Sequence, residues 1–124
     1  MRSFEGTLTA LITPFRDDAL DERALRELVE RQIAAGISGL VPCGTTGESV
    51  TLRTEEHHAV VRIVAEQARG RVPVLAGAGS NCTRHAIELS KLSLEAGADG
   101  LLLVCPYYNK PTQAGLVAHF QAIL

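Results

Sequence analysis

The sequence predicts an α/β protein with four consecutive βα units in one domain, residues 1–124. Short apolar runs recur at intervals of about 30 residues, the usual length of a βα unit. Helical patterns with capping residues at their starts and glycines at their ends lie between these runs. The run Leu101–Val104 is apolar without alternation, as a parallel sheet covered on both faces requires.

The first unit is expected to pair a strand at Thr7–Thr13 with the helix that follows it. Pro14 stops the strand because proline has no N–H for a sheet ladder. Asp21 is suited to cap the helix, and Gly36 is suited to the left-handed position after its end. The apolar face of this helix would carry Leu25, Leu28, Val29 and Ile33.

The second unit begins with a strand at Gly39–Val41, which ends at Pro42. Thr54 is a suitable N-cap for the next helix, where Glu55 and Glu56 would favour the positive end of the helix dipole. We expect this helix to bury a stripe of small apolar side chains, namely Val60, Val61, Val64 and Ala68.

The third unit combines a strand at Val72–Ala76 with a helix from about Thr83 to Ala96, ended by Gly97. The fourth combines the strand Leu101–Val104 with a helix that begins near Thr112. The apolar residues of this last helix are Leu116, Val117, Phe120, Ile123 and Leu124.

Two architectures accept four βα units: a small open doubly wound sheet, and about the first half of a (β/α)8 TIM barrel. Length alone favours the open sheet, because a half barrel leaves two sheet edges unpaired. The chain, however, stops at Leu124 within an apolar helix that has no capping residue. We therefore expect the N-terminal half of a single TIM-barrel domain, with the C-terminal half absent.

The composition excludes several classes of function. The 124 residues are 46% hydrophobic and carry a formal net charge of −2, without the basic excess typical of nucleic-acid binding. No apolar run approaches the roughly 18 residues of a membrane span. No signal peptide is visible at the N-terminus, so a cytoplasmic location is expected.

Neither cysteine nor histidine spacing predicts a metal site. The three cysteines form no CxxC pair, and each is expected to be a small buried hydrophobic residue: Cys43, Cys82 and Cys105. The four histidines fall in predicted helices without metal-ligand spacing, and we expect a surface or half-buried place for each: His57, His58, His85 and His119.

Ligands of both architectures gather where the strands end, so the segments that follow the strands carry the candidate chemistry. After the second strand, Gly44–Ser49 reads GTTGES, with two glycines around two hydroxyls and free N–H groups. Such a loop suits a small anion, a carboxylate or a phosphate, although a plain strand-to-helix turn is the alternative. The GxG segment Gly77–Gly79 after the third strand is more typical of close packing than of dinucleotide binding.

The segment Pro106–Pro111 follows the fourth strand and holds both tyrosines of the chain, which are expected to point to opposite faces. A phenol there could relay a proton or simply lie at an interface. The two lysines, Lys91 and Lys110, are expected at the surface, because a Schiff-base lysine needs a desolvated pocket.

The GTTGES and PYYNKP motifs together resemble the dihydrodipicolinate synthase family, as do Leu11–Phe15 and Arg71–Gly77. The resemblance implies a (β/α)8 barrel, usually a tetramer made of two tight dimers. It implies condensation of pyruvate with L-aspartate 4-semialdehyde through a Schiff base, in lysine and diaminopimelate biosynthesis, without metal or organic cofactor. The resemblance to N-acetylneuraminate lyase is weaker.

By the same resemblance, Thr46 would bind the pyruvate carboxylate, and Thr45 and Tyr108 would form a proton relay in which Tyr108 comes from a partner subunit. Tyr107 would lie at the dimer interface beside a lysine-inhibitor pocket. The matching inhibitor or interface positions are Tyr107, Asn81, His57 and Val50.

Two departures from the family pattern matter. Neither Lys91 nor Lys110 matches the Schiff-base position, so these 124 residues alone are expected to be inactive. Thr54 and His85 replace inhibitor-site residues, which predicts poor inhibition by lysine.

Three other functions stay open: a non-catalytic half-barrel or assembly module, another pyruvate aldolase, and a small open-sheet module that binds anions. The last is disfavoured, because no acidic cluster follows the first strand.

Overall fold

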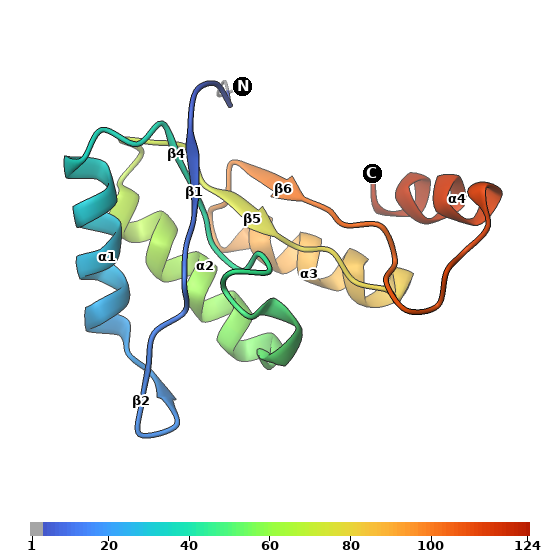
Figure 1. The fold of residues 1–124 in the computed structure, drawn as a ribbon, viewed down its shortest axis with the longest axis horizontal. Helices are drawn as coiled ribbons and strands as arrows, with labels where there is room; N and C mark the ends of the chain where they lie inside the picture. The colour runs from blue at the N-terminus through green and yellow to red at the C-terminus, as the bar shows by residue number, and fades with distance from the viewer. Residues whose placement is uncertain (1–3) are drawn as a thin grey trace.

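The computed structural model describes residues 4–124, and a parallel sheet runs through its centre (Figure 1). Strand β1 (Leu8–Ala10) pairs with β4 (Gly39–Val41), and β5 (Leu75–Gly77) pairs with β6 (Gly100–Leu102). A parallel bridge between Leu40 and Val74 joins the two pairs. The strands therefore lie side by side in the order in which they occur along the chain.

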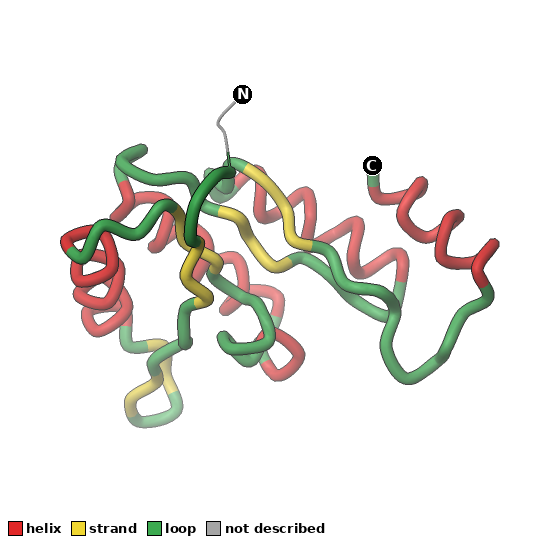
Figure 2. The backbone as a smooth tube through the Cα atoms, turned by 45° about the horizontal axis from the view of Figure 1, so that its top comes forward, coloured by secondary structure: helices red, strands yellow, loops and turns green. Residues whose placement is uncertain are grey.

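The helices form a row along this sheet, in which each packs against the next (Figures 1 and 2). Their bounds are α1 Glu22–Ala34, α2 Thr54–Ala68, α3 Thr83–Glu95 and α4 Gln113–Ile123. Right-handed crossovers that always step in one direction place every helix on the same face of the sheet. A doubly wound sheet instead reverses its strand order and carries helices on both faces. The fold is therefore part of a (β/α)8 barrel, as the sequence predicted.

The hydrophobic core lies between the sheet and the helices. Leu11, Leu40, Val74 and Ala76 face the helices and are almost fully buried. Helix α2 lies at the centre and contributes the predicted stripe together with Ile63, so that the α2 part of the core is Val60, Val61, Ile63, Val64 and Ala68.

The opposite face of the sheet is largely uncovered in the described part of the chain. Leu102 and Val104 are 45% and 46% exposed and lie on the face that becomes the interior of a closed barrel. Ile12, 57% exposed, instead borders a hollow beside α1 that Ala24 and Leu28 also line. The expectation of a sheet covered on both faces is therefore not met within residues 4–124.

The second strand has its predicted bounds, Gly39–Val41, whereas the other three differ because their hydrogen-bonded pairing ends earlier or begins later than the apolar run. The predicted strand Thr7–Thr13 contributes only Leu8–Ala10, with one further bond from Leu11 N to the Val41 carbonyl at 3.0 Å. The third strand begins at Leu75 rather than Val72, because Pro73 has no N–H and contributes only its carbonyl, which accepts from Leu40 N. The fourth spans Gly100–Leu102 rather than Leu101–Val104, and its last sheet contact is the bond from Ala78 N to the Leu102 carbonyl.

The helix ends follow the predicted capping, with one exception. The Asp21 carboxylate accepts from Ala24 N at 2.9 Å, and Gly36 and Gly97 take positive φ angles of +83° and +99° after their helices. The N-cap of α2 is Arg53 rather than Thr54, which is already helical. The Glu56 carboxylate fixes this start, because it accepts from Arg53 N at 2.8 Å.

A short hairpin that the sequence did not predict separates β1 from α1. Strand β2 (Phe15–Arg16) pairs antiparallel with β3 (Ala19–Leu20) across Asp17 and Asp18, whose φ angles are 51° and 60°. Two left-handed residues in a two-residue loop match the twist of antiparallel strands, and aspartate tolerates this conformation. A single 3-10 turn, η1 (Ser49–Thr51), precedes α2.

Two cysteine and two histidine predictions are wrong. Cys82 and Cys105 are exposed, because the former lies in the turn before α3 and the latter lies beyond the shortened β6. His57 and His119 are buried, with 2% and 5% exposure. The His119 ring lies between α4 and α3, where its Nδ1 is 2.9 Å from Thr83 Oγ1.

Helix α4 stands at the end of the row, next to α3 (Figure 2). Of its predicted apolar face, Val117 and Leu124 are exposed, at 57% and 98%. Within residues 4–124, no helix combines the length and apolar character that a bilayer crossing demands.

Two neighbouring residues just beyond β1 test which side chains belong to the core. Leu11→Ala should lower the free energy of unfolding by about 2–5 kcal/mol, because it opens a cavity in the core. Ile12→Ala should cost less than about 1 kcal/mol, because that side chain is already exposed. Urea denaturation of both variants measures the difference, and equal losses would contradict the assignment of Leu11 to the core and Ile12 to the surface.

Candidate active site

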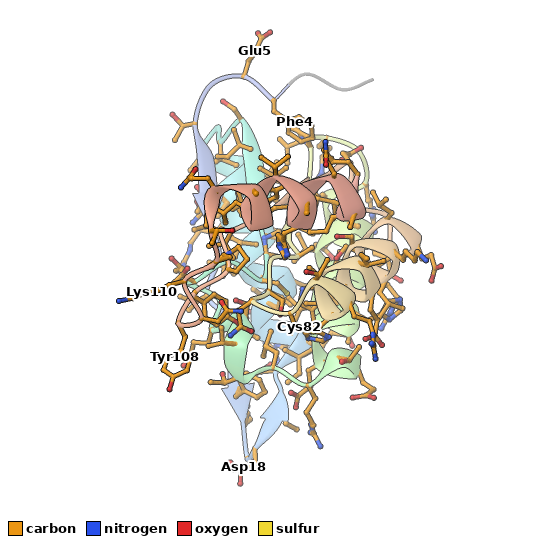
Figure 3. All side chains as sticks on the ribbon, turned by 90° about the vertical axis from the view of Figure 1, so that its right-hand side faces the viewer. Phe4, Glu5, Asp18, Cys82, Tyr108 and Lys110 are labelled. Atoms are coloured by element: carbon orange, nitrogen blue, oxygen red, sulfur yellow. The ribbon has the colours of Figure 1, made fainter. Side chains whose placement is uncertain are left out.

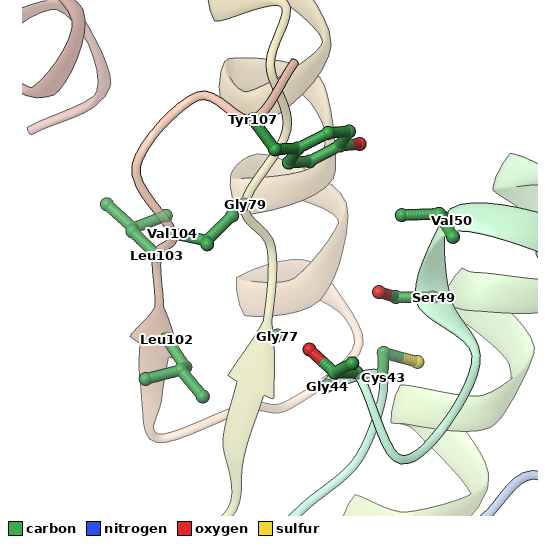
Figure 4. Close-up of a pocket in the computed structure, with 11 residues that line it drawn as sticks. Cys43, Gly44, Ser49, Val50, Gly77, Gly79, Leu102, Leu103, Val104 and Tyr107 are labelled. Atoms are coloured by element: carbon green, nitrogen blue, oxygen red, sulfur yellow. The ribbon is translucent and has the colours of Figure 1, made fainter. Parts of the chain in front are cut away.

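A cavity of about 510 Å³ opens where the strands end, between the loops that follow β4, β5 and β6 (Figure 4). This volume is typical of small-molecule sites. The cavity is lined by Cys43, Gly44, Thr45, Ser49, Val50, Gly77, Gly79, Leu102, Leu103, Val104 and Tyr107.

The loop after β4 forms two overlapping turns. Gly47 N donates to the Gly44 carbonyl and Glu48 N to the Thr45 carbonyl, both at 3.0 Å. Thr45 and Thr46 occupy the central positions of the first turn, and within the described residues their N–H groups and hydroxyls have no hydrogen-bond partner. Consecutive free N–H groups beside hydroxyls can bind a carboxylate, as the sequence indicated.

The bare α-carbon of Gly77 brings this loop against β5. A Cβ atom at Gly77 would lie 2.0 Å from the Cys43 carbonyl oxygen, a distance that no side chain permits. Gly79 is equally confined, because a Cβ there would lie 2.5 Å from Val104 Cγ1. The expectation that the GxG segment serves close packing is confirmed.

Cys43 lies at the floor of the cavity with an unreactive thiol. Its side chain is 1% exposed, and its Sγ is 3.8 Å from the His57 carbonyl oxygen. Burial raises the pKa of this thiol to about 12, because the thiolate would lose its hydration. Cys43 is therefore a neutral wall of the cavity rather than a nucleophile.

His57 supports the same floor from below. Its Nε2 lies 2.7 Å from the Gly77 carbonyl oxygen, which fixes the tautomer with the proton on Nε2. The other ring nitrogen, Nδ1, is buried without a partner. Burial lowers the pKa of His57 below its ordinary value, although the bond to Gly77 partly opposes this shift. His57 is thus a buried structural group, and its ring lines neither this cavity nor the neighbouring hollow.

The two tyrosines diverge, as predicted. Tyr107 lines the cavity, and its ring points across it toward Val50 (Figure 4). Tyr108 is 95% exposed and projects away from the molecule, not far from the exposed Lys110 (Figure 3). The cause is a left-handed backbone at Tyr108, with φ of 69°, rather than strand alternation. Asn109 Nδ2 ties this loop to the Asn81 carbonyl at 3.1 Å.

A second hollow of about 270 Å³ adjoins the cavity. Val50 and Tyr107 border both spaces, and Asn81 and His85 line only the second. No aspartate or glutamate lines this hollow in the described part of the chain. The nearest acidic partner of His85 is Glu88, whose Oε2 is 3.4 Å from His85 Nδ1 at the surface.

The structure brings together only some of the predicted site residues. Thr45, Val50 and Tyr107 line the first cavity, whereas Thr46 and Tyr108 lie outside it. Lys91 and Lys110 are exposed, as predicted. Among residues 4–124, no cluster of histidine, cysteine or acidic side chains could hold a metal ion.

Two kinds of contact were not found from the sequence. Leu102 and Val104 line the cavity as apolar strand residues without any functional signature. The Thr13 hydroxyl donates to the Gly47 carbonyl at 2.7 Å across the loop. The sequence signal that could have indicated this bond was a hydroxyl residue, Thr13, at the end of the predicted first strand.

Comparison with known proteins identifies a family model and named relatives that the chain resembles. Residues 3–124 match the model of the dihydrodipicolinate synthetase family. The chain is 63% identical over 120 residues to 4-hydroxy-tetrahydrodipicolinate synthase of Nitratidesulfovibrio vulgaris strain DP4, with 97% of this chain and 41% of that protein covered.

Solved structures agree with this comparison. The 4-hydroxy-tetrahydrodipicolinate synthase of Methylacidiphilum fumariolicum SolV superimposes with a TM-score of 0.95 at 51% identity, over 98% of this chain and 40% of that one. The chloride-inhibited dihydrodipicolinate synthase from Acinetobacter baumannii, complexed with pyruvate, superimposes with a TM-score of 0.94 at 47% identity. The match covers 98% of this chain and 42% of that one. The chain therefore spans about two fifths of the proteins that it matches.

The buried His57 predicts a loss of stability in mild acid. The unfolded chain takes up a proton near the ordinary histidine pKa of about 6.5, whereas folded His57 stays neutral to lower pH. The free energy of unfolding should therefore fall as the pH drops below about 6.5, until folded His57 is itself protonated.

Urea denaturation from pH 7.5 to 5 measures this dependence. His57→Gln should flatten the slope, while His58→Gln on the same helix should preserve it. A His57→Gln variant with the parental slope would contradict the assignment.

Proposed function

The chain belongs to the dihydrodipicolinate synthetase family, and we propose that it forms the N-terminal half of a (β/α)8 barrel lyase. This enzyme would condense pyruvate with L-aspartate 4-semialdehyde to give 4-hydroxy-tetrahydrodipicolinate, in lysine and diaminopimelate biosynthesis. The support is the named relatives and the free N–H and hydroxyl groups of the Thr45–Thr46 turn at the strand ends.

The pyruvate carboxylate would bind at this turn. Thr46 would hold the carboxylate through its N–H and hydroxyl, and Thr45, on the cavity wall, would pass a proton through its hydroxyl. A lone threonine is a poor base at neutral pH, so the Thr45 hydroxyl needs a linked phenol. Tyr108 fits this role from a partner subunit, because its exposed ring projects outward from the molecule and does not line its own cavity. The assembly would be a dimer of dimers.

The Schiff-base lysine would come from outside these 124 residues. Lys91 lies on α3 and Lys110 in the exposed loop after β6, and neither lines the cavity. Imine formation needs an amine whose pKa is lowered by desolvation, and neither position provides a desolvated environment. Residues 1–124 alone would therefore not catalyse the condensation. The chemistry requires no metal and no organic cofactor, and the enzyme would act in the cytoplasm.

Threonine variants of the complete polypeptide test the proposed carboxylate site. Thr46→Val should raise the KM for pyruvate by about tenfold or more, because a charged ligand loses a hydrogen bond. Thr45→Val should lower kcat by about 10²-fold with a smaller effect on KM, because it interrupts proton transfer.

Steady-state assays with both substrates measure these effects. A parent polypeptide without condensation activity would favour an assembly module or another pyruvate aldolase.

The second hollow predicts weak feedback inhibition by lysine. A lysine ammonium needs a carboxylate partner, and the hollow offers His85 where an acidic side chain would be required. We expect the complete enzyme to be insensitive to millimolar lysine, and His85→Glu to strengthen lysine binding by about tenfold.

Inhibition assays and calorimetry with L-lysine test this expectation. Lys91→Glu is the matched control, because it makes a larger charge change on the same helix outside the hollow. Strong inhibition of the unchanged enzyme by lysine would contradict the prediction of weak feedback inhibition.

A further inference from the structure

The loop that carries Thr45 and Thr46 is anchored by one side chain from the segment that follows β1. The Thr13 hydroxyl donates to the Gly47 carbonyl oxygen at 2.7 Å. Thr13 is 6% exposed, and the bond spans 34 positions of the sequence. Water cannot easily replace a donor at so buried a position, so the Gly47 carbonyl depends on this hydroxyl.

Gly47 lies in a confined place that lets this bond control the turn. A Cβ atom there would approach the Leu11 carbonyl to 3.0 Å, Cys43 N to 3.2 Å and Thr13 Oγ1 to 3.3 Å. The Gly47 N–H closes the turn on the Gly44 carbonyl, while its own carbonyl accepts from Thr13. One residue therefore joins the Thr45–Thr46 turn to the first strand.

The loop needs such an anchor because its backbone is strained at both ends. Cys43 and Glu48 take left-handed conformations, with φ of 55° and 57°, which disfavour residues with a side chain. Thr51 Oγ1 donates to the Glu48 carbonyl at 2.9 Å, but that bond is exposed and water can take its place. The buried bond from Thr13 is therefore the one of the two that water cannot easily replace.

We propose that Thr13 is a positioning residue, which aims the N–H groups of Thr45 and Thr46 at the substrate carboxylate. The proposal rests on the proposed function, since the carboxylate belongs to pyruvate. Without the Thr13 hydroxyl, the buried Gly47 carbonyl loses its donor and the turn must rotate to find another. The direct consequence falls on pyruvate binding, because the carboxylate that this turn holds in the proposed site belongs to pyruvate.

The test uses the complete, active polypeptide and variants of nearly equal size. Thr13→Val removes the donor and keeps the shape, and should raise the KM for pyruvate by about tenfold while the KM for L-aspartate 4-semialdehyde stays within about twofold. Thr13→Ser restores the hydroxyl and should return the KM for pyruvate to within about twofold of the parent.

Thr9→Val is the matched control, on β1 four residues before Thr13. The Thr9 hydroxyl bonds to Gln32 Oε1 on α1 at 3.1 Å, away from the loop, so both KM values should stay parental. If Thr13→Val does not fold, Thr13→Cys replaces it, because a thiol is a weaker donor than a hydroxyl. The KM for pyruvate of the cysteine variant should lie above that of the serine variant and below about ten times the parental value.

The proposal would be overturned if Thr13→Val kept both KM values and only lowered the amount of folded, active enzyme. That pattern would indicate a purely structural role. A parental KM in the cysteine variant, where only that variant folds, would overturn it equally. Failure of the proposed function is distinguishable, since the unchanged polypeptide would then condense no substrates at all.

Discussion

The absence of a side chain at Gly77 is the constraint on which this end of the molecule depends. The Cys43 carbonyl occupies the place that a Cβ atom would need, and His57 holds the Gly77 carbonyl from below. This close approach seats the loop after β4 against β5 and closes the cavity floor. Cys43 is buried and neutral as a consequence, so the floor contributes shape and the turn above it contributes the polar groups.

The polar and covalent parts of the proposed chemistry are divided between this chain and the rest of a barrel. These residues contribute backbone N–H groups and hydroxyls, which in the proposed site would recognise a carboxylate without a cation. The surface lysines cannot supply a desolvated amine, and the apolar face with Leu102 and Val104 is open. Both features fit a segment that spans about 41% of its relatives' length.

Features fixed by local chemistry could be predicted from the sequence, and features fixed by distant partners could not. Asp21, Gly36 and Gly97 act through neighbouring residues, so the helix ends were predictable. The GTTGES turn was predictable because glycines and hydroxyls stand together in the chain. His57 was expected at the surface or half-buried because the carbonyl that holds it is 20 residues away, and Thr13 was missed because its acceptor is 34 residues away. The ends of three of the four strands were missed because hydrogen-bonded pairing, not composition, limits them.

Reductive trapping tests the central claim most directly. The polypeptide isolated from its natural source is treated with pyruvate and borohydride, and its intact mass and peptide map are measured. The proposal predicts one reduced pyruvate adduct per polypeptide, on a lysine outside residues 1–124. An adduct on Lys91 or Lys110, or the absence of any adduct, would contradict it.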